Sequence, residues 1–174
     1  MYSRRLAPLL LSALLASLAG CGPATREAPP APTVTADHDA VGAIRAAGAK
    51  DDSVIDVKPL RDPAVDALVS EAQQDERSGN YAAAAAALDR ALQISPESPD
   101  LLQERAEVAV LLKDFTAAAK LAHKSWSLGP QVGPLCARNW QTIVEARLQA
   151  NDAVGAATAR KWVEQCHKAG VPRY

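Results

Sequence analysis

From Asp62 onward the chain matches itself at a spacing of 34 residues. The matching pairs are Leu68 and Leu102, Ala72 and Ala106, Tyr81 and Phe115, Ala84 and Ala118, and Pro96 and Pro130. A third copy follows at a spacing of 38, and its extra residues fall in a Gly- and Pro-rich stretch at 129–136. Repeats of this length are structural units that bury their apolar faces only by stacking on one another, and about three are needed for stability. The period therefore predicts a stacked repeat array.

Each copy shows the start and stop signals of two helices. Asp62 before Pro63 is an N-cap followed by proline at the first helical position, and Ser98 before Pro99 repeats it. In the first copy, residues 79–80 form the turn and Pro96 ends the second helix. The turns of the other copies fall at 113–114 and 151–152. We expect helical hairpins over 62–96, 98–130 and 134–169.

These residues carry a family resemblance. The first copy reads Gly-Asn-Tyr-x-x-Ala then Ala-Leu-x-Ile-x-Pro, and the second reads Lys-Asp-Phe-x-x-Ala then Leu-x-Pro. The pattern resembles the tetratricopeptide repeat, a helix–turn–helix of 34 residues. It implies an all-α fold of three tandem hairpins, an α-solenoid. The third copy keeps Trp140 but departs from the family at Val144 and Arg160, which suits a terminal repeat.

The composition agrees with closely packed helices. Hydrophobic residues make up 48% of the chain and aromatic residues only 4%, so alanine supplies much of the core. Ala84, Ala118 and Ala156 fall where paired helices approach most closely. The formal net charge of -1 argues against a nucleic-acid-binding protein, which would carry a basic patch.

The N-terminus has the pattern of a secretory signal. Arg4 and Arg5 precede an apolar stretch at 6–19 that is too short to span a bilayer. It ends in Leu-Ala-Gly-Cys at 18–21, which resembles the lipobox of bacterial lipoproteins. That family implies a signal peptide at 1–20, acylation of Cys21 and, with Gly22 next, an outer-membrane anchor facing the periplasm. The alternative is an ordinary signal peptide with a chance cysteine at the cut.

A tether is expected between the anchor and the repeats, at 21–61. The run 22–35 has four prolines and almost no large apolar side chains, so it cannot fold by burial. Residues 40–50 suggest a weak helical turn interrupted by Gly42 and Gly48. A β-prone patch at 54–57 either docks on the repeats or stays loose. Residues 170–174 form a C-terminal tail.

Catalytic and cofactor motifs are not found. The sequence has no Gly-rich phosphate loop, no Gly-x-Ser-x-Gly elbow and no His-Glu-x-x-His. Cys166 and His167 adjoin, but neighbouring residues on a helix point in different directions, and His123 reads as a surface residue. We therefore expect no enzyme activity, no metal and no cofactor.

The resemblance implies a partner groove, because the first helices of tetratricopeptide hairpins line a concave face. Carrying those positions over by period gives Asp66, Val69, Gln73, Glu76, Arg77, Asp100, Gln103, Glu107, Val110, Leu111, Arg138, Gln141, Glu145, Leu148 and Gln149. Five acids against two arginines would suit a peptide with basic or neutral polar side chains, and some apolar content opposite Val110 and Leu111. The alternative is that these are only solvated helix faces.

A disulfide is predicted between the cysteines that remain once Cys21 is acylated. Cys136 lies 15 residues before Asn151, at the turn of the third hairpin, and Cys166 lies 15 after it. Residues equally far from the turn lie level in an antiparallel hairpin, and the envelope is oxidising. The alternative is two buried free thiols.

Two functions fit these observations. The first is a lipid-anchored adaptor that binds an envelope protein or peptide, in pilus or secretion assembly or in control of peptidoglycan enzymes, by analogy with lipoproteins of this class. The second is a structural envelope lipoprotein whose repeats self-associate through the outer face of the last hairpin.

Overall fold

The computed structural model describes residues 39–49 and 61–167. Within these ranges the chain forms seven α-helices and no strand: α1 (Ala40–Gly48), α2 (Pro63–Arg77), α3 (Tyr81–Ile94), α4 (Pro99–Leu111), α5 (Phe115–Leu128), α6 (Pro134–Gln149) and α7 (Ala153–Cys166). The all-α class and the three hairpins are confirmed. The signal peptide, Cys21, the patch at 54–57 and the tail at 170–174 lie outside the described residues.

The helices begin where the sequence places their caps, although Ser98 precedes α4 without a capping bond from its side chain. An Asp62 carboxylate oxygen accepts a hydrogen bond from the Ala64 amide at 2.8 Å, and Pro63 follows at the first helical position. Asp114 and Asp152 accept from the amides three residues ahead, at the starts of α5 and α7. Helix N-termini leave backbone N–H groups without intrahelical partners, so these carboxylates stabilise the helix starts.

The three hairpin turns share one backbone geometry. Each contains a left-handed residue, Gly79 with φ 77°, Lys113 with φ 61° and Asn151 with φ 56°. The amide that follows it bonds back to a carbonyl five residues earlier, as from Asn80 to Asp75 at 2.8 Å. This geometry satisfies the last carbonyls of the first helix and reverses the chain at once. It lets both helices of a hairpin pack along their whole length.

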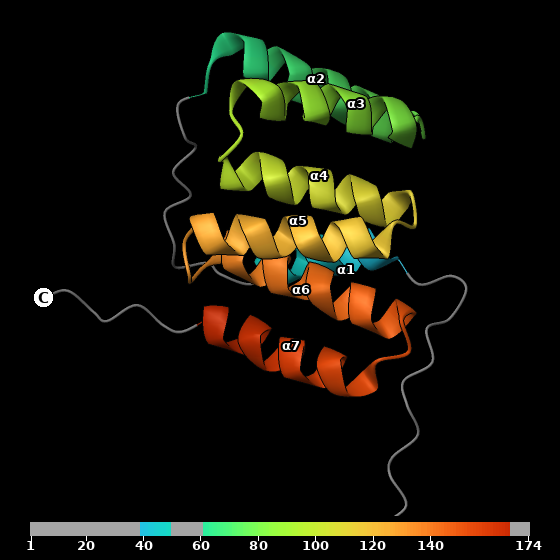
Figure 1. Cartoon of the computed structure of the whole chain (residues 1–174), viewed down its shortest axis with the longest axis vertical. Coiled ribbons are helices and arrows are strands. Elements are labelled where there is room, and N and C mark those ends of the chain that lie inside the picture. Colours follow the sequence, from blue (N-terminus) through green and yellow to red (C-terminus); the bar gives the residue numbers. More distant parts are fainter. Residues whose placement is uncertain (1–38, 50–60, 168–174) are drawn as a thin grey trace, which may run out of the picture. The chain divides into compact units, whose positions relative to one another are not determined.

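Helices α2 to α7 lie one after another in a stack (Figure 1). Ala84, Ala118 and Ala156 are fully buried, with no exposed surface, at the close approaches that the repeat period predicts. In this part of the chain, no helix is long and apolar enough to cross a bilayer.

Three tryptophans pack together where the last hairpin meets the one before it. Trp140 of α6 stacks on Trp162 of α7 with ring centroids 5.2 Å apart, and Trp126 of α5 meets Trp140 edge-on at the same separation. Aromatic pairs of this kind add stabilisation beyond the area they bury. His123 is exposed and lies against the cluster, 5.4 Å from the Trp126 ring.

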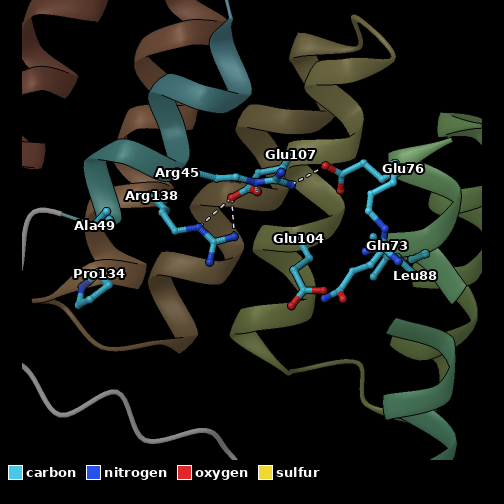
Figure 2. A pocket seen from close by; sticks show the side chains of 12 residues that line it. Arg45, Ala49, Gln73, Glu76, Leu88, Glu104, Glu107, Pro134 and Arg138 are labelled. Carbon is cyan, nitrogen blue, oxygen red and sulfur yellow. Dashed lines mark hydrogen bonds and ion pairs between the residues drawn. The ribbon is translucent and has the colours of Figure 1, made fainter. Parts of the chain in front are cut away.

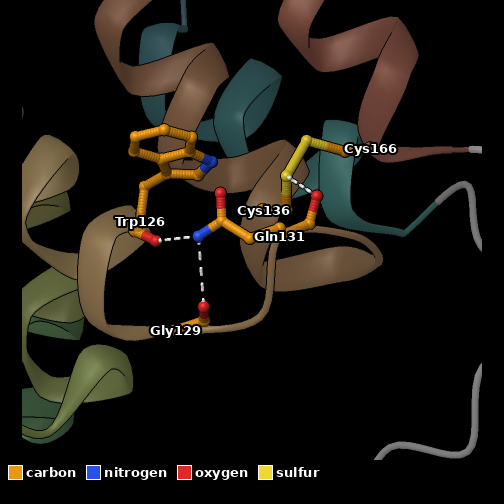
Figure 3. The surroundings of a disulfide bond; sticks show 5 residues. All are labelled: Trp126, Gly129, Gln131, Cys136 and Cys166. Atoms are coloured by element: carbon orange, nitrogen blue, oxygen red, sulfur yellow. Dashed lines mark hydrogen bonds between the residues drawn. A yellow bond between two sulfur atoms is a disulfide. The ribbon is translucent and has the colours of Figure 1, made fainter.

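A disulfide joins Cys136 and Cys166, the pair that the sequence predicts, with Cα atoms 5.6 Å apart (Figure 3). It links the first turn of α6 to the last residue of α7. The loop before α6 is held beside it, because the Gln131 side chain donates to the carbonyls of Trp126 and Gly129. The Gly133 amide also donates to the Cys166 carbonyl at 2.9 Å.

The tether prediction is wrong for residues 40–48, which form the continuous helix α1. Gly42 lies in its first turn, where its amide donates to the capping Asp39 carboxylate at 2.7 Å. Gly48 is its last residue and lies against α6: a Cβ there would come within 2.8 Å of the Arg138 Cγ. Neither glycine breaks the helix, and the absence of a side chain at Gly48 allows close packing.

Candidate functional site

The first helices of the three hairpins, α2, α4 and α6, present what we name the inner face. Helices α4 and α6 contact each other, and α1 packs against both. The segment before the repeats therefore returns to cover part of the face on which the sequence predicts the partner groove.

The predicted groove residues differ widely in exposure. The exposed ones are Asp66, Gln73, Arg77 and Gln149; the half-buried ones are Glu76, Asp100, Leu111, Arg138, Gln141 and Leu148; and the buried ones are Val69, Gln103, Glu107, Val110 and Glu145. Glu107 and Glu145 are only 1% and 2% exposed, so the expectation that they lie open on the groove is wrong.

Glu107 is buried because it is the centre of a charged network (Figure 2). Its Oε1 accepts from the Nε and Nη2 of Arg138 at 2.8 and 2.6 Å, and from Gln103 Nε2 at 3.0 Å. Its Oε2 accepts from Arg45 Nε at 2.9 Å. Gln103 also donates to Thr142 at 2.9 Å. A carboxylate can be buried when it is paired and hydrogen-bonded in this way, and here the bonds join α1, α4 and α6.

Arg45 extends the network to α2. Its Nη2 lies 2.8 Å from Glu76 Oε1, so this one α1 side chain bridges the first and second hairpins. Burial by itself lowers the pKa of Arg45, but hydrogen bonds and attraction from Glu107 and Glu76 outweigh it and raise the pKa above its ordinary value. Arg45 is therefore a fixed cation of the inner face.

An open cleft of about 570 Å³, the inner cleft, remains between α1, α2, α4 and α6. Its charged and amide lining consists of Arg45, Gln73, Glu76, Arg77, Glu104, Glu107 and Arg138. Burial raises the pKa of the Glu104 carboxyl, against the opposing attraction of Arg61 and Arg138. The cleft thus combines fixed cations and anions, rather than the acidic surplus that the sequence predicts.

The apolar part of the predicted groove is already filled. Val110 is 5% exposed and clusters with Leu111, Val41 and Ile44, the last two from α1. Helix α1 thus covers the groove at this position, and an apolar side chain of a partner would contact α1 here instead of Val110.

Sequence reasoning missed Arg45, Gly48 and Glu104 as members of the cleft. Glu104 falls between groove positions of α4, so the repeat period does not select it. For α1 the signals were Asp39 as an N-cap and the aliphatic residues Val41 and Ile44 three positions apart.

A second hollow of about 780 Å³ lies over α3, α4 and α5. Its floor includes Leu92, Leu102 and Leu121, and Lys120 and Lys124 stand among its lining residues. Among the described residues its lining holds a single ion pair, between Arg105 and Asp89 at 2.8 Å, whereas the ion pairs of the inner cleft join several helices. The inner cleft is therefore the better candidate site.

The fold and the site define a tandem helical-repeat protein of the kind that binds other proteins. A family model described as a tetratricopeptide repeat matches residues 76–138. A solved structure, described as the globular C-terminal domain of LpoP from P. aeruginosa, is 34% identical with a TM-score of 0.57, covering 60% of this chain and 99% of that one. A comparison with curated proteins finds no match. The chain belongs to the tetratricopeptide repeat lipoproteins of bacteria.

Proposed function

We propose that the protein is a lipid-anchored adaptor, held by acylated Cys21 at the outer membrane, that faces the periplasm and binds an envelope protein through its inner face. The observation that carries this proposal is the inner cleft, in which four helices hold cations and anions in fixed positions around an open volume of about 570 Å³. Charges fixed by ion pairs favour selective recognition of a partner with a complementary pattern.

What the partner does is inferred from the class of lipoproteins to which this chain belongs. Lipoproteins of this kind serve pilus or secretion assembly, or control peptidoglycan enzymes, and we take control of a peptidoglycan enzyme as the working function. The likeness to the LpoP domain supports an envelope lipoprotein of this class. A structural lipoprotein that self-associates is the competing function.

The test is affinity purification from crosslinked native envelopes. The double variant Gln73→Glu with Arg77→Glu reverses the charge at one end of the cleft, where both side chains are exposed on α2. We expect it to lose the partner that the wild type enriches. The double variant Arg160→Glu with Gln165→Glu makes the same change in charge at exposed positions of α7 and should keep the partner.

The identity and behaviour of the partner then decide between the functions. A peptidoglycan enzyme that depends on Gln73 and Arg77 supports the proposal. A pilus or secretion protein with the same dependence keeps the adaptor and changes its pathway. Recovery of only a second copy of the chain, or of a partner that the α2 double variant retains, contradicts the adaptor.

A further inference from the structure

Helix α1 matches the part of the inner face that it covers, in charge and in apolar character. It carries one arginine together with aliphatic residues. Val41 and Ile44 pack with Ala109 and Val110 at the end of α4, and Arg45 bonds to Glu107. The helix therefore lies on the inner face as a ligand would.

We propose that the surface of α4 and α6 beneath α1 is a helix-binding site that α1 occupies within its own chain, and that the partner inserts a short helix of the same chemistry in its place. We name this surface the α1 seat and define it by Glu107, Val110, Pro134 and Arg138. The inference rests on the proposed function and specifies its partner class.

The seat selects its occupant by charge. The Glu107 carboxylate, 1% exposed, already receives two bonds from Arg138 and one from Gln103, and its Oε2 receives the bond from Arg45. An arginine adjacent to the second aliphatic residue is the side chain that reproduces this bond, because arginine is always charged and forms directional bonds to carboxylates. A glutamate there would face Glu107 and Glu76.

The seat also selects by size. A Cβ at Gly48 would come within 2.9 Å of the Arg138 Cδ and 3.1 Å of the Pro134 carbonyl oxygen. The occupant must therefore carry a very small residue four positions after its second aliphatic residue. The partner segment that fits is an Ala- and Gly-rich helix with aliphatic residues three apart, followed at once by arginine and, three residues later, by glycine.

Helix α1 can leave its seat without dismantling the repeats. It has nine residues, and isolated helices of this length are marginal in water. Two apolar clusters, one of α2, α3 and α4 and one of α4 to α7, are composed of repeat residues and stay intact when α1 leaves. The other two clusters include Val41, Ile44 and Ala47 of α1 and become exposed until a partner helix refills them. Attachment to the chain keeps α1 at a local concentration of roughly millimolar, so modest intrinsic affinity keeps it seated. A partner helix then competes with α1. Its apparent affinity equals its intrinsic affinity multiplied by the fraction of molecules in which the seat is open.

The experiment uses the full chain and a fluorescent peptide with the sequence of residues 39–49, capped at both ends. Gly48→Val should release α1 from the seat, because the new side chain collides with Arg138 and Pro134. Ala46→Val is the matched control, since Ala46 is exposed on the same helix. We expect Gly48→Val to bind the peptide about tenfold tighter than the wild type or Ala46→Val, which corresponds to α1 filling its seat in roughly nine-tenths of wild-type molecules. A peptide with Arg45→Glu should not bind.

Equal peptide binding by Gly48→Val and the wild type overturns the proposal, as does equal binding of the Arg45→Glu peptide. Tryptophan emission from the α5–α7 cluster reports whether Gly48→Val folds. If it does not, the chain with Arg45→Glu takes its place, and it too should bind the peptide about tenfold tighter than the wild type does. A wild-type chain that dimerises by exchanging α1 makes a second copy the occupant and also overturns the proposal. These outcomes leave the adaptor standing, because its test depends on Gln73 and Arg77 of α2, outside the seat.

Discussion

The Nε of Arg45 donates to Oε2 of Glu107 at 2.9 Å across 62 residues of sequence. Arg45 lies before the repeats and is 49% exposed, whereas Glu107 lies in the second repeat and is 1% exposed. A segment outside the repeat pattern thus supplies the hydrogen bond to the second oxygen of a carboxylate inside it. This pair makes α1 a part of the site and not only of the tether.

The first prediction concerns Glu107. Glu107→Lys places a cation beside Arg45 and Arg138, so it should lower the free energy of unfolding by about 3–5 kcal/mol. Urea denaturation followed by helical circular dichroism measures this loss. Glu164→Lys makes the same charge change at an exposed position of α7 and should stay within about 0.5 kcal/mol of the wild type. An equally small effect of Glu107→Lys would mean that the buried network contributes little to folding.

The second prediction concerns pH. Burial raises the pKa of Glu104 above its ordinary 4.5, so the native state holds this proton more tightly than the unfolded state. The unfolding free energy therefore loses a contribution as the pH rises from 4.5 through the raised pKa. Glu104→Gln cannot titrate, so the stability of the variant minus that of the wild type should increase over this window. Denaturation at a series of pH values measures the difference, and a flat or falling difference contradicts the assignment.

The third prediction concerns the disulfide. The bond between Cys136 and Cys166 closes a loop with a sequence separation of 30. Its reduction should lower the free energy of unfolding by about 3.5 kcal/mol in the chain-entropy account. The double variant Cys136→Ala with Cys166→Ala should be insensitive to reductant. Mass spectrometry of periplasmic protein alkylated without reductant gives an independent check, since an alkyl label on both cysteines would rule out the bond.

The fourth prediction concerns the anchor. Cys21→Ser should leave an uncut precursor that no longer sediments with outer membranes, because the resemblance to bacterial lipoproteins makes Cys21 the acylated residue at the cut. Fractionation and immunoblotting measure both effects. A Cys21→Ser chain that is still cut and still sediments with outer membranes would contradict the lipobox interpretation.

Much of the fold follows from the sequence because its causes are local and periodic. Asp62, Gly79 and Pro96 act on their own turns, so the sequence places the starts of α2 and α4 and the turn within each hairpin. The disulfide follows from the symmetry of Cys136 and Cys166 about the turn at Asn151.

The site follows less well, because its causes are long-range. The repeat period assigns Glu107 to the inner face, but nothing local shows that a helix 62 positions away covers it. Gly42 and Gly48 lower helix propensity, and propensity reasoning therefore treats 40–48 as a broken turn. Tertiary packing overrides this: Ile44 is fully buried, and Gly48 gains a close contact with α6 that no larger residue allows.

The central claim is that the inner face binds an envelope protein, and site-specific photocrosslinking in intact envelopes tests it most directly. A photoreactive residue replaces Gln73 in the inner cleft in one strain and the exposed Arg160 of α7 in another. We predict that the chain substituted at Gln73 crosslinks one envelope protein and that the chain substituted at Arg160 does not. A crosslink to that protein from Arg160 alone, or from Gln73 only to a second copy of the chain, would contradict the claim.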